Sequence, residues 1–303
     1  MTSPLPTRLR PGFLLCAATF LATVALAAPK DPMGKFFVAD VAGDAQIDLG
    51  TRIDELTKHS VYDADGATLE TLDNSVDAMV FSNGTGLFLD ADTRLRVTKF
   101  QQEPFVPNRT DMEREPSVSR TLAYLFHGTV AISASVLAPG SLMRYKTALG
   151  GANIRSGQVV IQSKGERTVI SVLGGASIVF PASVQTSDDL LHAGQQIVFT
   201  PDPNGGPPLM TIQEIPTGEL DALEHLVEMA SAARHTVYFE MRGGGSGSNS
   251  GAITAFDGDD GGTPSSPTGP GTDEIVAIPL ALSNVPVQFE VSPASLTSRP
   301  SGG

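Results

Sequence analysis

Between residues 36 and 200, short apolar runs alternate with turn residues along the chain. Within a run the apolar positions recur with a period of two, as in 93–100 (TRLRVTKF), where Leu95 and Val97 alternate with polar neighbours. Such alternation is typical of a strand with one buried face, and each run is bounded by Gly, Pro, Asn or Asp. The main runs are 36–47, 76–81, 87–89, 93–100, 124–134, 141–147, 152–161, 168–172, 176–180 and 195–200. The pattern predicts an all-β domain, as an antiparallel β-sandwich, a barrel or a β-solenoid-like domain of many short strands.

Glycines mark the expected turns between these strands. The strongest hairpin signal is Asn83-Gly84, which lies between two apolar runs. We expect Gly84, Gly128, Gly157 and Gly194 to be structural turn glycines at strand ends with positive φ. Residues 101–120 are polar and proline-containing, and they predict a loop inserted between strands.

One amphipathic helix is predicted after Pro216. Residues 219–234 place apolar side chains three and four positions apart, and Thr217 is the expected N-cap. The apolar face consists of Leu220, Leu223, Leu226, Val227 and Ala230. This face either packs on the β-domain or docks a partner, and a short strand, 236–241, is expected to follow the helix.

The first 27 residues have the features of a secretory signal peptide. Arg8 and Arg10 precede an apolar run that ends in Ala25-Leu26-Ala27, the small-x-small pattern that predicts cleavage after Ala27. The run is shorter than the roughly 20 residues that a membrane span needs. Large residues precede Cys16, so lipidation is not expected. We therefore expect a periplasmic or extracellular protein with no transmembrane segment in the mature chain.

The C-terminal part changes composition at Gly243. Residues 243–273 are rich in Gly, Ser and Pro, which is typical of a flexible linker. Residues 274–303 form a tail whose alternation allows a short strand or two. The predicted organisation is a signal peptide (1–27), a β-domain (28–215), a helix and strand packed on it (216–242), the linker (243–273) and the tail (274–303).

Composition and motifs argue against catalysis and against nucleic acid. Without residues 1–27 the chain keeps 18 basic and 33 acidic residues, whereas nucleic-acid binding needs a basic surface. Cys16 leaves with the signal peptide, so disulfides and thiolate metal sites are excluded. The histidines show no metal-ligand spacing, and no G-x-S-x-G elbow occurs. We expect no enzyme activity, no metal and no cofactor.

An ordered series of strand-and-glycine blocks runs through the domain. The blocks are 41–46, 67–71, 75–85, 87–89, 93–97, 122–130, 141–147, 152–157, 168–176 and 191–196. Their order and spacing resemble the FecR-like domain of bacterial envelope regulators. Ser156-Gly157 departs from the glycine-threonine step that is usual in that family. The resemblance implies an all-β domain with a binding or signal-relay role and no chemistry.

The family also defines what the chain is expected to lack. FecR-like regulators place a cytoplasmic anti-sigma segment and a transmembrane helix before this domain, and here a signal peptide stands in that place. Direct control of a sigma factor is therefore not expected. The leading hypothesis is an exported binding and signal-relay module with an envelope protein as partner. The alternatives are a structural envelope or matrix component that self-associates, and an enzyme whose site the sequence does not reveal.

Overall fold

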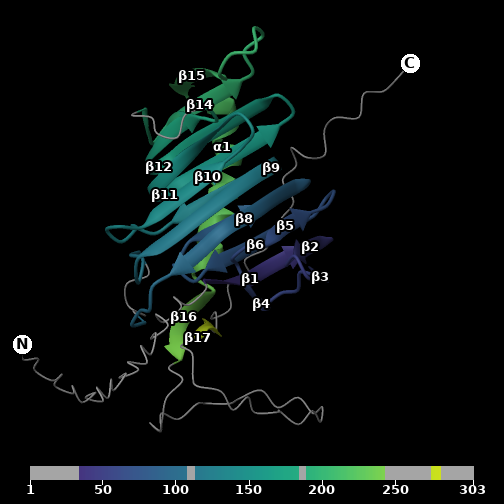
Figure 1. Cartoon of the computed structure of the whole chain (residues 1–303), viewed down its shortest axis with the longest axis vertical. Helices are drawn as coiled ribbons and strands as arrows, with labels where there is room; N and C mark the ends of the chain where they lie inside the picture. The colour runs from purple at the N-terminus through teal and green to yellow at the C-terminus, as the bar shows by residue number, and fades with distance from the viewer. Residues whose placement is uncertain (1–33, 108–112, 184–188, 243–273, 281–303) are drawn as a thin grey trace, which may run out of the picture. The chain divides into compact units, whose positions relative to one another are not determined.

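The computed structural model describes residues 34–107, 113–183, 189–242 and 274–280 (Figure 1). The predicted signal peptide, the linker 243–273 and the tail beyond residue 280 lie outside these described residues. Within them, the prediction of an all-β fold with a single helix is confirmed. The strands are β1 (Lys35–Ala42), β2 (Ala45–Asp48), β3 (Ile53–Glu55), β4 (Val61–Asp63), β5 (Thr68–Thr71), β6 (Val76–Phe81), β7 (Gly86–Leu89), β8 (Thr93–Gln102), β9 (Ser119–Ala134), β10 (Leu142–Lys146), β11 (Gly150–Lys164), β12 (Arg167–Pro181), β13 (Leu190–His192), β14 (Gln195–Thr200), β15 (Leu209–Glu214), β16 (Val237–Arg242) and β17 (Glu274–Pro279).

Three long strands, β9, β11 and β12, connect the two layers of the fold. The first half of β9 pairs with β8 and β10, whereas its second half pairs with β7 and β11. Similarly, β12 pairs with β14 near its start and with β13 near its end. Each long strand thus contributes one half to a front layer (with β2, β3, β5, β8, β10 and β13) and the other to a rear layer (with β1, β4, β6, β7, β14 and β15). The front layer faces the viewer in Figure 1.

The first hydrophobic core fills the space between these layers. It takes Leu95 and Tyr145 from the front layer and Phe36 and Phe81 from the rear layer, all of them fully buried. Alternation along β6 explains the arrangement, because Met79 and Phe81 enter this core whereas Val76, Ala78 and Val80 point to the opposite side. The architecture is therefore that of a sandwich whose layers share strands.

Two features of the sheet differ from the sequence prediction. Gly128 and Gly157 were expected at strand ends, but β9 and β11 run through them. Their positive φ angles, 97° and 92°, bend the strands where they pass between layers, so these two glycines lie inside bent strands and not at turns. The sheet is also not wholly antiparallel, because β10 pairs with β9 in parallel.

Helix α1 (Thr217–Arg234) covers the outer side of the rear layer and builds a second core there. Leu223, Leu226 and Val227 are buried against that layer, and Leu220 packs beside them, so this face of the helix is occupied within the chain. Gly86 permits the close approach, because a Cβ there would lie 2.0 Å from the Ala230 carbonyl oxygen. In the part of the chain that the structure describes, no helix is long and apolar enough to cross a membrane.

The two ends of α1 are held differently. The N-cap is Pro216, not the expected Thr217, and it makes no side-chain cap hydrogen bond, since proline suits the entry φ but carries no side-chain acceptor. At the other end Arg234 is buried, and its guanidinium donates to the Gly84 carbonyl oxygen at 2.9 Å and to Ser135 Oγ at 3.0 Å. These bonds tie the helix to the β6–β7 hairpin through Gly84 and to the residue that follows β9 through Ser135.

A two-stranded ribbon follows the helix. Strand β16 pairs antiparallel with β17, which the chain reaches after the linker region. Val237 and Ile275 are buried and join the second core. Residues 274–279 thus pack on the main body through their pairing with β16.

Candidate functional site

The outer side of the front layer carries a concentration of positive charge. None of β8, β9, β10, β11 or β12 contains an aspartate or glutamate. Alternation turns Leu95 and Val97 into the first core and leaves Arg94 and Arg96 exposed. The same rule, applied along the neighbouring strands, defines the basic face as Arg94, Arg96, Arg120, Arg144, Lys146 and Arg155 with Tyr124 and Phe126.

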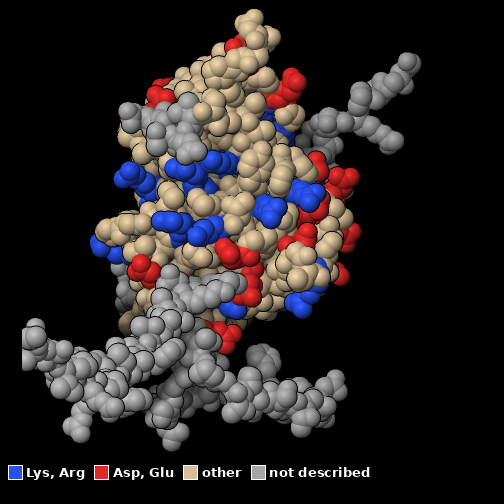
Figure 2. Space-filling view, in the orientation of Figure 1, with Lys and Arg blue, Asp and Glu red and all other residues tan. Residues whose placement is uncertain are grey.

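Strand register brings these side chains side by side. Tyr124 lies opposite Arg96 on β8 and opposite Lys146 on β10, so an aromatic ring sits between two cations. One step along, Leu122 lies beside Arg144, which in turn lies opposite Asn153. Figure 2 shows the Lys and Arg side chains gathered over these strands, with acidic side chains toward β2, β3 and β5.

Aromatic contacts hold several of the cations in place. The Arg94 guanidinium lies 5.6 Å from the ring centroid of Phe126, whose ring meets that of Tyr124 edge-on at 4.8 Å. Arg144 stacks over Phe180 at 5.3 Å, and its Nε donates to Asn153 Oδ1 at 2.7 Å. A hollow of about 170 Å³ opens between Leu122, Tyr124, Arg144 and Lys146. The face therefore offers preorganised cations beside an apolar hollow.

The basic face carries groups that can bind anionic and apolar ligands. Guanidinium groups recognise carboxylates through paired hydrogen bonds, and exposed Tyr and Phe supply apolar contact area. Among the described residues, no group of three His, Cys, Asp or Glu side chains is placed to hold a metal ion. The chemistry that fits the basic face is the recognition of an anionic partner.

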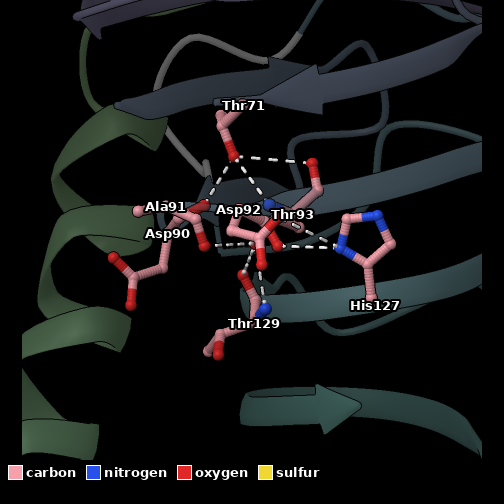
Figure 3. A network of polar contacts seen from close by, with 7 residues as sticks. All are labelled: Thr71, Asp90, Ala91, Asp92, Thr93, His127 and Thr129. Atoms are coloured by element: carbon pink, nitrogen blue, oxygen red, sulfur yellow. Dashed lines mark hydrogen bonds and ion pairs between the residues drawn. The ribbon is translucent and has the colours of Figure 1, made fainter. Parts of the chain in front are cut away.

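A polar corner at one end of the basic face fixes the chain where β7 leads into β8 (Figure 3). Thr71 Oγ1 donates to the Asp90 carbonyl oxygen at 2.6 Å and accepts from Thr93 N at 3.1 Å. Thr93 Oγ1 donates to the Thr129 carbonyl oxygen at 3.2 Å and accepts from Thr129 N at 2.9 Å. His127 Nδ1 lies 2.9 Å from the Asp92 carbonyl oxygen. The corner is held from three strands at once.

The residues singled out from sequence are dispersed in the structure. Gly84, Gly128, Gly157 and Gly194 all have positive φ, but they lie at separate turns and bends and form no common site. The cleavage residues Ala25 and Ala27 lie outside the described residues. The helix face packs on the rear layer, as described above.

The basic face was not predicted from the sequence, because only the overall balance of basic and acidic residues was considered. The net charge of −13 hides a stretch between Glu115 and Glu166 that contains no acidic residue. Counting charge strand by strand would have shown this segregation. The pairing that brings the cations together, including the parallel β9–β10 pair, required the structure.

The chain was compared with protein-family models, with curated proteins and with solved structures. No protein-family model matches the chain, and no curated protein matches it. Among solved structures it is similar to two crystal structures of a candidate anti-sigma factor from Parabacteroides distasonis ATCC 8503, each with 15% sequence identity and a TM-score of 0.38. The matches cover 52% of this chain and 64% of each of those chains, so this chain spans less than two thirds of their length. A likeness at this level assigns neither function nor partner.

Proposed function

We propose that this chain is an exported, non-catalytic binding and signal-relay module that acts through protein–protein contacts in the bacterial envelope. The basic face carries the proposal, since it concentrates cations and aromatic rings on one side of an otherwise acidic chain. The sequence resemblance to FecR-like domains and the signal-peptide pattern support the same role. The partner chemistry that complements this face is an acidic protein segment with apolar side chains.

Protein is a better occupant than nucleic acid for two reasons. The rest of the chain is acidic and would repel a long polyanion, whereas a short acidic segment can contact the face alone. The exposed Phe126 and the hollow beside Leu122 offer room for aliphatic side chains. Salt screening should weaken the contact, because most of these cations are solvent-accessible.

Neutralising two cations of the basic face is expected to weaken binding of a labelled peptide built from Glu, Leu and Phe. The double variant Arg96→Ala/Lys146→Ala removes the cations on either side of Tyr124, and we expect about a fivefold to tenfold loss of affinity by fluorescence anisotropy. The matched control Arg52→Ala/Lys58→Ala removes the same charge from two exposed residues outside the basic face and should change affinity less than about twofold.

Two outcomes would count against this role. Equal peptide affinity of both double variants would show that the basic face is not the contact surface. Tighter binding of single-stranded oligothymidine than of the acidic peptide would replace the protein partner by a nucleic acid. A photo-crosslinker at Phe126 in the secreted chain would then identify the natural partner, with loss of the crosslink in the Arg96→Ala/Lys146→Ala background as the criterion.

A second candidate function is a self-associating structural component, and strand β15 favours it. This strand ends the sheet, all its residues are exposed, and Leu209, Met210 and Ile212 are among them. Its only charge is Glu214, and it contains neither the lysine nor the proline that commonly protects an edge. Antiparallel pairing of two β15 edges would join two copies of the chain.

Light scattering across a range of concentrations tests this second function. Self-association through β15 predicts a concentration-dependent dimer that Ile212→Lys converts to monomer. The control Val106→Lys places the same charge at an exposed loop position and should leave the dimer intact. A strict monomer at all concentrations would rule the structural role out.

A further inference from the structure

A groove lies between helix α1 and the rear layer, on the opposite side of the sandwich from the basic face. Its volume is about 440 Å³, within the range of small-molecule pockets. One wall is the first half of α1, with Ala222, Leu223 and Leu226. The other wall comes from the Asp90–Ala91 corner and the β11–β12 hairpin. We call this space the helix groove.

The helix groove combines an apolar floor with charges of both signs. Leu223, Leu226 and Val169 are buried there. Lys164 and Arg167 lie on the wall formed by the β11–β12 hairpin and are positively charged. Asp90 and Glu219 also line the groove and are acidic. A purely anionic ligand would meet the two carboxylates, and a purely cationic ligand would meet the two bases. The lining therefore favours a ligand that carries both charges.

Asp90 is the most informative group in the groove. The Thr71–Thr93–Thr129 network fixes its backbone, and Figure 3 shows its carboxylate directed away from that network toward α1. Its Oδ1 is buried without a hydrogen-bond partner among the described residues. Burial raises the pKa of Asp90, and the Ala91 amide and then the charge of Lys164 offset a part of this. A buried acceptor without a donor is costly, so a ligand N–H group would satisfy it.

We propose that the helix groove binds a short zwitterionic peptide with aliphatic side chains. Its ammonium group would donate to Asp90, its carboxylate would lie at Lys164 and Arg167, and its side chains would cover Leu223, Leu226 and Val169. The volume accommodates a dipeptide and excludes a folded partner. This site is independent of the basic face and of the proposed protein partner.

Calorimetric titration of the full processed chain with L-leucyl-L-leucine tests the proposal. We expect binding that weakens about tenfold for the N-acetyl analogue, which lacks the ammonium, and about tenfold for the amide analogue, which lacks the carboxylate. Asp90→Asn should weaken the parent dipeptide but not the N-acetyl analogue. Lys164→Ala/Arg167→Ala should weaken the parent but not the amide.

The control variant is Asp92→Asn. Its carboxylate belongs to the same corner but is 79% exposed and does not line the groove, so dipeptide affinity should stay that of the wild type. No heat at millimolar dipeptide, or equal binding of all three ligands, would overturn the proposal. Weaker binding of only one of the two analogues would also overturn the proposal, because the ligand class would then be a simple acid or a simple amine. These ligand comparisons use the wild-type chain and so hold even if a variant fails to fold.

Discussion

Replacing Gly128 by alanine is expected to lower the free energy of unfolding by about 3 to 5 kcal/mol. Gly128 has a φ of 97°, a backbone conformation that L side chains rarely adopt. An added Cβ would lie 2.2 Å from Thr93 Oγ1 and 2.4 Å from Thr93 Cα. Backbone strain and steric overlap therefore add together. Urea unfolding followed by circular dichroism measures the loss.

Gly194→Ala is the matched control for this substitution. Gly194 has a similar φ of 86°, but no atom lies within 4 Å of the added Cβ. Gly194→Ala should therefore lower the free energy of unfolding only by the cost of the left-handed conformation, about 1 to 2 kcal/mol. If the two variants lost the same stability, the close approach of Thr93 to Gly128 would not contribute.

The substitution at Gly128 also tests how the two layers are joined. Just beyond this residue β9 leaves its pairing with β8 and takes up pairing with β7. The Thr93 hydroxyl, which bonds both the N–H and the C=O of Thr129, holds the crossing in place. A side chain at residue 128 would push Thr93 away and open this corner, which is the same corner that directs Asp90 toward the helix groove.

Local patterns in the sequence predicted the elements that depend on neighbouring residues. Alternation identified β6 and β8, Asn83-Gly84 identified the hairpin between β6 and β7, and three- and four-residue spacing identified α1 within two residues of its start. These features depend on side chains that are close along the chain, so a single sequence contains enough information to predict them.

Features that depend on distant residues were not predictable in the same way. A glycine bend and a turn produce the same break in the pattern, so the sequence predicted two strands, 168–172 and 176–180, where the structure has the continuous strand β12. Gly128 and Gly157 were likewise expected at strand ends but lie within β9 and β11. The parallel pairing of β10 with β9 places Lys146 beside Tyr124, and no local signal specifies that register. The helix groove likewise joins Asp90 to residues of α1 more than a hundred positions away.

Asp77 is a buried carboxyl group whose surroundings could not be predicted from the sequence. It lies on β6, on the side that faces the first core, and neither carboxylate oxygen has a hydrogen-bond partner among the described residues. Burial, and next the charge of Asp40, raises the pKa of Asp77 to about 8, while the Ala78 amide offsets a part of this. The folded chain therefore holds this carboxyl in its protonated form at neutral pH.

Asp77→Asn is expected to remove a loss of stability that develops as the pH rises from 3.8 to about 8. Between the ordinary pKa of 3.8 and about 8, the folded state keeps a proton that the unfolded state has released. Stability is thus fully present below pH 3.8 and falls as pH rises, by up to about 1.4 kcal/mol per pH unit. Relative to the wild type, the variant should gain about 3 to 4 kcal/mol between pH 5 and pH 8. Urea unfolding at pH 5, 6, 7 and 8 measures this difference.

The control for Asp77→Asn is Asp73→Asn, which changes an exposed carboxylate in the turn before the same strand. Its unfolding free energy should follow the pH dependence of the wild type. Parallel pH curves for the wild type and Asp77→Asn would mean that Asp77 is not protonated in the folded chain. A fixed offset with the same slope would reflect only the packing of the new amide. Only a change of slope supports a buried proton, because linkage ties the slope to protons bound and not to contact energy.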